Sequence, residues 1–298
     1  MAKTTQPNAA GSAPIELANA ADAKFDAQFD AQFDAAKQWS AGRYDLLAHR
    51  LQPLSAALVT AVGRRLAKEG RSLADQRVVD VACGTGNAAI EAAQEGASVT
   101  GIDLTPQLLR VARKRSQQAK AAVEWLEGNA ESLPLPESSQ DVCLSCLGVM
   151  FAPDCKAAAS ELARVLRPKG ILGLLSWQPK QWDDPFSAPM VEALGVPPEG
   201  TPLPTDWGDP LQADDLLAPY FEGIEHTLGV HRWLFGSIAE ATEMIVDQSP
   251  LHVNALASLS AAQRERFVAT LTRLLGDCTT PAGIVIKIPY LLLTARKS

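Results

Sequence analysis

Short apolar runs alternate with helical patterns through the middle of this 298-residue chain, and this alternation limits the possible folds more than any other feature. Short apolar runs bounded by turn residues are typical of buried strands, whereas apolar residues repeated every three or four positions indicate helices. The predicted strands are Arg77–Val81, Ser98–Ile102, Val123–Leu126, Val142–Cys146 and Ile171–Trp177, and the helices between them are Asn87–Gln94, Pro106–Ala122 and Cys155–Leu166. Strands that alternate with helices predict an α/β protein whose parallel sheet carries helices on both faces.

The last third of the chain adds two more strand-like runs, Gly223–Leu234 and Gly283–Ala295. The segment between them is long enough for two helices. Ser260, with Gln263 three positions later, forms the capping box that begins the second of these helices.

The N-terminal region is organised differently. Residues 1–20 show no periodicity and are predicted to form a disordered tail. Phe25, Phe29 and Phe33 then repeat every four residues, which predicts an amphipathic helix. We expect this helix to lie on the core or on a partner chain, as in a homodimer.

A further helix is predicted over Pro53–Glu69, with Gly70 as its stop signal. Beyond the tail we expect one domain, with a core and two insertions that form a helical lid over the ligand-binding ends of the strands. The domain is 21–298, the core is 71–177 and 221–298, and the insertions are 178–220 and 237–280.

The charge balance argues against a nucleic-acid binder. The chain has 27 Lys and Arg against 34 Asp and Glu, a net charge of −7, whereas phosphate contacts require a basic surface. The one local basic run falls on a predicted helix and is interpreted as its solvated face: Arg110, Arg113, Lys114, Arg115 and Lys120.

Other composition features indicate a cytoplasmic protein. No stretch approaches the ~20 apolar residues of a membrane-spanning helix, and the first residues lack the apolar core of a signal peptide. The five cysteines are scattered, which suits reduced thiols. Cys143 and Cys146 form a C-x-x-C, but in a strand they face opposite sides, so we predict no metal site.

The segment Val78–Asn87 is predicted to form a ligand-binding loop, because a buried strand leads through a glycine-bearing turn into a helix. Such a turn lets the backbone approach a ligand closely, and it lies at the end of the sheet where open parallel sheets bind ligands. Asp103 follows at the end of the second strand, where its carboxylate could accept hydrogen bonds from both hydroxyls of a ribose.

Spacing alone also fits a dinucleotide site, since Gly84, Gly86 and Ala89 match the glycine pattern with an acid about 20 residues later. An NAD(P)-dependent oxidoreductase is therefore one alternative. Asp80, however, places a negative charge beside the loop, which suits an ammonium or sulfonium better than a pyrophosphate. A second polar cluster, 128–134, follows the third strand, and no Tyr-x-x-x-Lys pair of a short-chain dehydrogenase is present.

Five segments in order resemble the successive motifs of class I S-adenosylmethionine-dependent methyltransferases: Val78–Asn87, Val99–Pro106, Gly128–Pro134, Asp141–Asp154 and Glu161–Gly170. Residues 80–86 and 162–170 most resemble the type 11 group, which contains the ubiquinone and menaquinone biosynthesis C-methyltransferases. The resemblance implies a Rossmann-like, doubly wound sheet of seven strands, with an antiparallel last strand, N-terminal helices and a helical lid.

The resemblance also implies which residues bind the cofactor S-adenosylmethionine and its product S-adenosylhomocysteine. The glycine loop would hold the methionine end, Asp103 the ribose, and the remaining residues the adenine or the reaction point. The implied set is Asp80, Ala82, Gly84, Thr85, Gly86, Asp103, Leu104, Asn129, Ala130, Leu147 and Tyr44, the last from the stretch Trp39-x-x-Gly42-x-Tyr44. Relatives usually have Gly in place of Ala82 and Asp in place of Asn129.

Methyl transfer is an in-line displacement, so positioning the two reactants in a dry site can supply most of the catalysis. His226 and His231 are candidates for a base, and Met150, Phe151 and Trp177 for substrate contacts. The tryptophan-rich lid favours an apolar or aromatic small molecule, such as a quinone precursor or a secondary metabolite. A non-catalytic protein that binds S-adenosylmethionine and acts through the phenylalanine stripe is the other alternative.

Overall fold

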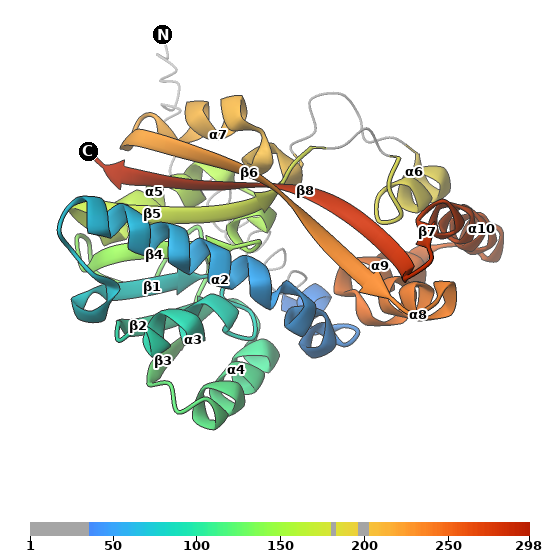
Figure 1. The fold of residues 1–298 in the computed structure, drawn as a ribbon, viewed down its shortest axis with the longest axis horizontal. Coiled ribbons are helices and arrows are strands. Elements are labelled where there is room, and N and C mark those ends of the chain that lie inside the picture. The colour runs from blue at the N-terminus through green and yellow to red at the C-terminus, as the bar shows by residue number, and fades with distance from the viewer. Residues whose placement is uncertain (1–35, 180–182, 196–202) are drawn as a thin grey trace, which may run out of the picture.

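The computed structural model describes residues 36–179, 183–195 and 203–298 (Figure 1). The predicted tail at 1–20 and the Phe25, Phe29 and Phe33 stripe lie outside the described residues.

One mixed sheet forms the centre of the molecule, with the strand order β3-β2-β1-β4-β5-β8-β6. Neighbours from β3 to β5 are parallel, and β8 runs antiparallel between β5 and β6. The strands are β1 Arg77–Val81, β2 Ser98–Asp103, β3 Val123–Glu127, β4 Gln140–Cys146, β5 Leu166–Trp177, β6 Phe221–Phe235 and β8 Gly283–Lys297. All seven predicted strands are confirmed, and a two-residue strand, β7 (Thr279–Thr280), pairs with β8 in addition.

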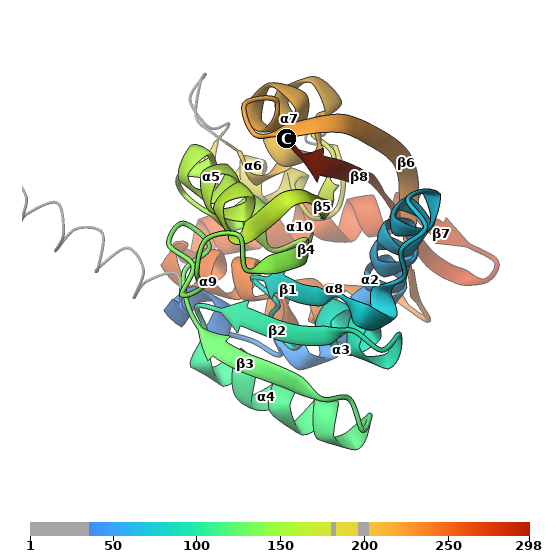
Figure 2. The ribbon, with the colours of Figure 1, turned by 90° about the vertical axis from the view of Figure 1, so that its left-hand side faces the viewer.

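Helices cover both faces of this sheet, as predicted. In Figures 1 and 2, α2, α3 and α4 lie over one face and α5 and α7 over the other. Their bounds are α2 Tyr44–Lys68, α3 Asn87–Gln94, α4 Pro106–Gln118, α5 Cys155–Val165 and α7 Pro210–Leu217. The fully buried side chains of Leu144, Leu172 and Leu174 in β4 and β5 mark the centre of the core.

Helix α2 begins earlier than the sequence pattern suggested. We expected its start at Pro53, because proline is common in the first turn of a helix, but the helix begins at Tyr44 and contains Pro53. Leu51, Leu54 and Leu58 are all buried on one side of it. This continuous apolar face compensates for the backbone hydrogen bond that proline cannot donate.

Strands β6 and β8 pair along their whole length, from Phe221 opposite Lys297 to Phe235 opposite Ile284. Helices gather around the far end of this ribbon (Figure 1): α6 Ala188–Leu194, α8 Ile238–Glu243, α9 Pro250–Ser258 and α10 Ala261–Asp277. The 237–280 segment therefore contains three helices rather than two, with a π-helical turn, η4 (Met244–Gln248), between α8 and α9. The Ser260–Gln263 capping box of α10 is confirmed.

The basic run on α4 is only partly the solvated face that we expected. Arg113 and Lys114 are exposed, but Arg115 is half-buried and donates hydrogen bonds to the carbonyl and hydroxyl oxygens of Thr85. In the part of the chain that the structure describes, no helix has the length and apolar content needed to cross a bilayer.

Candidate active site

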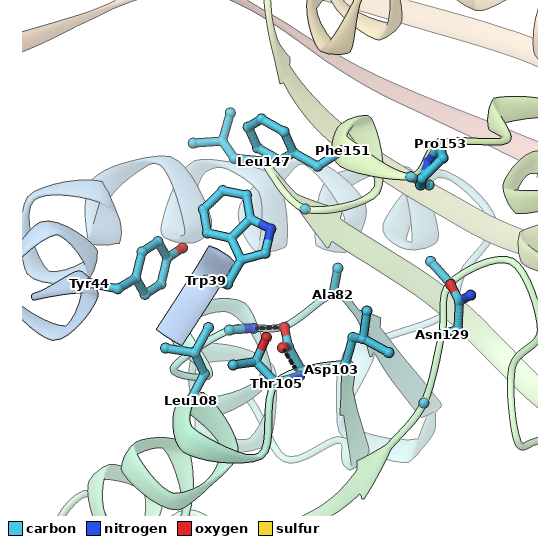
Figure 3. A pocket seen from close by; sticks show the side chains of 16 residues that line it. Trp39, Tyr44, Ala82, Asp103, Thr105, Leu108, Asn129, Leu147, Phe151 and Pro153 are labelled. Atoms are coloured by element: carbon cyan, nitrogen blue, oxygen red, sulfur yellow. Dashed lines mark hydrogen bonds between the residues drawn. The ribbon is translucent and has the colours of Figure 1, made fainter. Parts of the chain in front are cut away.

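The loops that follow β1, β2 and β4 meet at one edge of the sheet, where they enclose a cavity (Figure 3). We call it the first cavity; its lining includes Trp39, Tyr44, Ala82, Gly84, Asp103, Leu104, Asn129, Ala130, Leu147 and Phe151. Eight of the predicted cofactor-binding residues thus lie around one space, although their positions in the chain range from 44 to 147.

Asp103 is fixed by two backbone amides. The Gly84 N–H donates to one carboxylate oxygen at 2.7 Å, and the Thr105 N–H donates to the other at 2.8 Å (Figure 3). Its side chain is 7% exposed, and this burial raises its pKa above the usual range despite the two amides. Each oxygen keeps acceptor capacity toward the cavity, as binding of two ribose hydroxyls requires.

A smaller, inner cavity lies on the other side of Tyr44, lined by Tyr44, Asp80, Thr85, Asn87 and Leu147 among others. Asp80 is 1% exposed and accepts a hydrogen bond of 2.9 Å from the Ala89 N–H at the start of α3. Burial raises the pKa of Asp80 to about 7, and the nearby Asp103 charge adds to this effect. A protonated acid in a small polar cavity is set to ionise when a cation binds there.

The loops hold unusual backbone conformations. Ala82 and Leu147 have φ angles of 53° and 58°, in the left-handed region that non-glycine residues seldom adopt. Gly148 packs so closely that a Cβ there would lie 2.5 Å from the Ala82 carbonyl oxygen. The left-handed angle is one that glycine adopts readily and alanine does not, and such strain is concentrated at functional sites.

Gly86 differs from the other predicted cofactor-binding residues, because it lines neither the first nor the inner cavity. A Cβ on Gly86 would lie 2.4 Å from the ring of Trp125 in β3, and a Cβ on Gly101 would lie 2.3 Å from the same ring. The second glycine of the loop is therefore needed for packing against this tryptophan, a contact that the sequence pattern does not reveal.

Replacing Gly86 with Ala should cost about 3 kcal/mol of stability, since the left-handed φ of 84° is unfavourable for alanine and Trp125 has to shift. Urea unfolding measures this change. Gly70→Ala is the matched control, because Gly70 also has a positive φ but a Cβ there would meet nothing within 4 Å. Equal losses in the two variants would show that the Trp125 contact does not constrain Gly86.

Asn129 lies at the side of the first cavity near the end of β3 (Figure 3). Its Oδ1 accepts a hydrogen bond of 3.0 Å from the Glu131 N–H, which closes a tight turn. The predicted use of this oxygen as an acceptor for an adenine amino group therefore depends on its second lone pair.

An outer cavity shares the wall 151–153 with the first cavity. Its apolar lining includes Met150, Phe151, Trp207 and Leu216, and its rim carries Lys156, Asp206 and Asp215. The 3₁₀ turns η2 (Val149–Phe151) and η3 (Pro204–Gly208) supply Met150, Phe151, Pro204 and Trp207 to this lining. Two of the predicted substrate residues, Met150 and Phe151, are thus placed together, and Phe151 also touches Trp39, with ring centroids 4.8 Å apart.

The predicted histidines lie elsewhere. The His226 Nε2 atom lies 2.9 Å from Oδ1 of Asp214 in α7, and His226 lines none of these three cavities. His231 lies 6.1 Å from Trp177 and 5.3 Å from Trp233, measured between ring centroids. Burial lowers the pKa of His231, so it is neutral near pH 7, and its Nε2 is buried without a hydrogen-bond partner.

Comparison with known proteins agrees with this geometry. A family model described as a methyltransferase domain matches residues 79–174. The chain is 35% identical to an uncharacterized protein of Mycobacterium tuberculosis, across 88% of this chain and 93% of that protein. It is 39% identical to the malonyl-[acyl-carrier protein] O-methyltransferase of Serratia marcescens, across 45% of this chain and 48% of that enzyme.

The comparison with solved structures concerns the fold alone. The crystal structure of the Bacillus subtilis YcgJ protein superposes with a TM-score of 0.52 at 19% identity, covering 75% of this chain and 92% of that one. The sheet order, the glycine loop and the family match define a Rossmann-like methyltransferase. The chain belongs to the S-adenosylmethionine-dependent methyltransferases, and S-adenosylmethionine is its cofactor. The oxidoreductase alternative, which rested on glycine spacing alone, is set aside.

Proposed function

We propose that the first and inner cavities together bind S-adenosylmethionine, with the adenosine in the first and the methionine end in the inner one. Two observations support the fit. Asn87 lines the inner cavity, and its Oδ1 atom is buried and has no hydrogen-bond partner. Once the Asp80 carboxyl group in the same cavity has lost its proton, it can accept a hydrogen bond from the ammonium group of the cofactor.

In this assignment Asp103 accepts hydrogen bonds from the ribose hydroxyls, and Leu104 packs on the adenine beside Asn129 and Ala130. Thr85 is held in place by Arg115 and supports the loop around the methionine end. When bound, the cofactor supplies an electrophilic methyl group on a sulfonium.

We further propose that the methyl acceptor is an apolar or aromatic small molecule that binds in the outer cavity. The observation that carries this proposal is the shared wall at 151–153, because an acceptor on one side of it lies next to the cofactor on the other. Met150, Phe151 and Trp207 provide apolar surface, while the charged rim orients a polar group.

The chain's part in the reaction is then positioning and exclusion of water. The apolar side chains that line the two cavities exclude water from the reacting atoms, and the strained turn at Leu147 and Gly148 lets the backbone approach the reaction point. The insertions 178–220 and 237–280 would form a lid over the site. Residues 21–298 would act as one domain.

Isothermal titration with S-adenosylhomocysteine tests the cofactor assignment, with NADH as the control. We expect micromolar binding of the first compound and none of the second. Incubation with methyl-labelled S-adenosylmethionine and a panel of hydroxylated aromatics, quinone precursors and free carboxylic acids then tests the acceptor class, by mass spectrometry of the products. Transfer only to the carboxylic acids without aromatic character would refute the proposed acceptor.

A further inference from the structure

A sharp elbow at Gly42 joins the helical turn at residues 36–40 to α2. Gly42 has a φ of +66°, and a Cβ there would lie 2.6 Å from the carbonyl oxygen of Gln248. The N–H of Arg43 donates a hydrogen bond of 3.0 Å to the same oxygen. Only glycine allows this close approach in this conformation.

Gln248 belongs to the 237–280 insertion, far from Gly42 in the sequence. It is the last residue of the π-helical turn η4, a form of helix that is rare and frequent at functional sites. A second hydrogen bond ties the same two segments together, from Asn254 Nδ2 to the carbonyl oxygen of Gln38 at 2.8 Å. The insertion therefore holds the elbow on both sides of Gly42.

Tyr44 follows the elbow as the first residue of α2. Its ring packs on the glycine loop, with Cε1 3.1 Å from where a Cβ of Gly84 would lie. The ring lines both the first and the inner cavity and so lies between them. These cavities have volumes of about 100 and 20 Å³, whereas small-molecule sites usually have ~300–1,000 Å³. A cofactor that spans both cavities must therefore move this ring.

We propose that Gln248 is a positioning residue for methyl transfer: through Gly42 and Arg43 it holds Tyr44 over the glycine loop and so controls how long the cofactor stays bound. This inference rests on the proposed cofactor site. It makes the 237–280 insertion part of that site, although no residue of the insertion lines the first or the inner cavity. Tyr44 swings out as the cofactor enters, and the elbow returns it to cover the bound cofactor.

Stopped-flow fluorescence of the full chain with S-adenosylhomocysteine tests the proposal, because Trp39 lies 5.9 Å from the Tyr44 ring. Gly42→Ala should accelerate dissociation about tenfold by displacing Tyr44. In a Tyr44→Ala background the same substitution should have no further effect, since residues that act through each other are not additive. Val253→Ala is the control, because Val253 contacts the same elbow without contributing the carbonyl.

Additive effects in this double-mutant cycle, or an unchanged dissociation rate in a folded Gly42→Ala protein, would overturn the positioning role. Thermal unfolding checks that the variants are folded. Failure of the cofactor assignment is recognised separately: an Asp103→Asn protein that binds S-adenosylhomocysteine as tightly as the wild type would refute the site itself. If Asp103→Asn loses affinity for S-adenosylhomocysteine as expected and Gly42→Ala leaves the dissociation rate unchanged, the cofactor site stands and only the positioning role of the Gly42 elbow is refuted.

Discussion

Replacing Asp103 with Asn should weaken S-adenosylhomocysteine binding about 100-fold, or ~2.7 kcal/mol. The Gly84 and Thr105 amides each donate to a different oxygen of this carboxylate. Asparagine has one acceptor oxygen, so one of these two N–H groups would face an NH₂ group, and one ribose hydroxyl would lose its acceptor. Isothermal titration at pH 8 measures the loss.

Asp209→Asn serves as the matched control for this experiment. Asp209 caps α7 by accepting from two backbone amides through a single oxygen, so asparagine can replace it, and it lines none of the three cavities. The control should bind as the wild type does. If a folded Asp103→Asn protein also bound normally, the ribose contact would have to be assigned to another residue.

Cofactor binding should strengthen as the pH rises toward 7 and then level off, because Asp80 must lose a proton to pair with the ammonium of the ligand. Its pKa of about 7 in the free protein means that each pH unit below 7 costs about 1.4 kcal/mol of binding free energy. The affinity for S-adenosylhomocysteine should therefore rise almost tenfold per unit between pH 5.5 and 6.5. Titrations across this range measure the profile.

Asp80→Asn removes this titration and has a second expected effect. The raised pKa means that the folded wild type binds a proton more tightly than the unfolded chain, so wild-type stability falls as the pH rises from about 4 to about 7. The Asp80→Asn protein should not show this loss of stability. At pH 8 it should unfold at a higher temperature than the wild type, with a free energy of unfolding that is greater by on the order of a few kcal/mol. A wild-type pH profile retained in the variant would assign the proton to another group, such as the buried Asp103.

Some of the site could be predicted because its motifs are local. The loop from Asp80 to Gly86 and the acid at Asp103 lie at strand ends, and parallel strands bring their carboxyl ends to the same edge of a sheet. The roles of Gly86 and Asn129 could not be predicted in the same way. Gly86 packs against Trp125 from another strand, a neighbour that spacing does not specify. Asn129 closes a local turn with Glu131, which uses one lone pair of the oxygen that was assigned to the adenine.

The sequence by itself determined the α/β class, the seven principal strands and the position of the glycine loop, because periodicity and turn residues act over a few neighbouring positions. Only the tertiary structure decided which segments, distant in the sequence, pack against these elements. The 237–280 insertion meets the Gly42 elbow through the Gln248 carbonyl, and α2 continues through Pro53 because its apolar face is buried. Such contacts join segments more than 200 residues apart, and backbone carbonyls that make them carry no side-chain signature in the sequence.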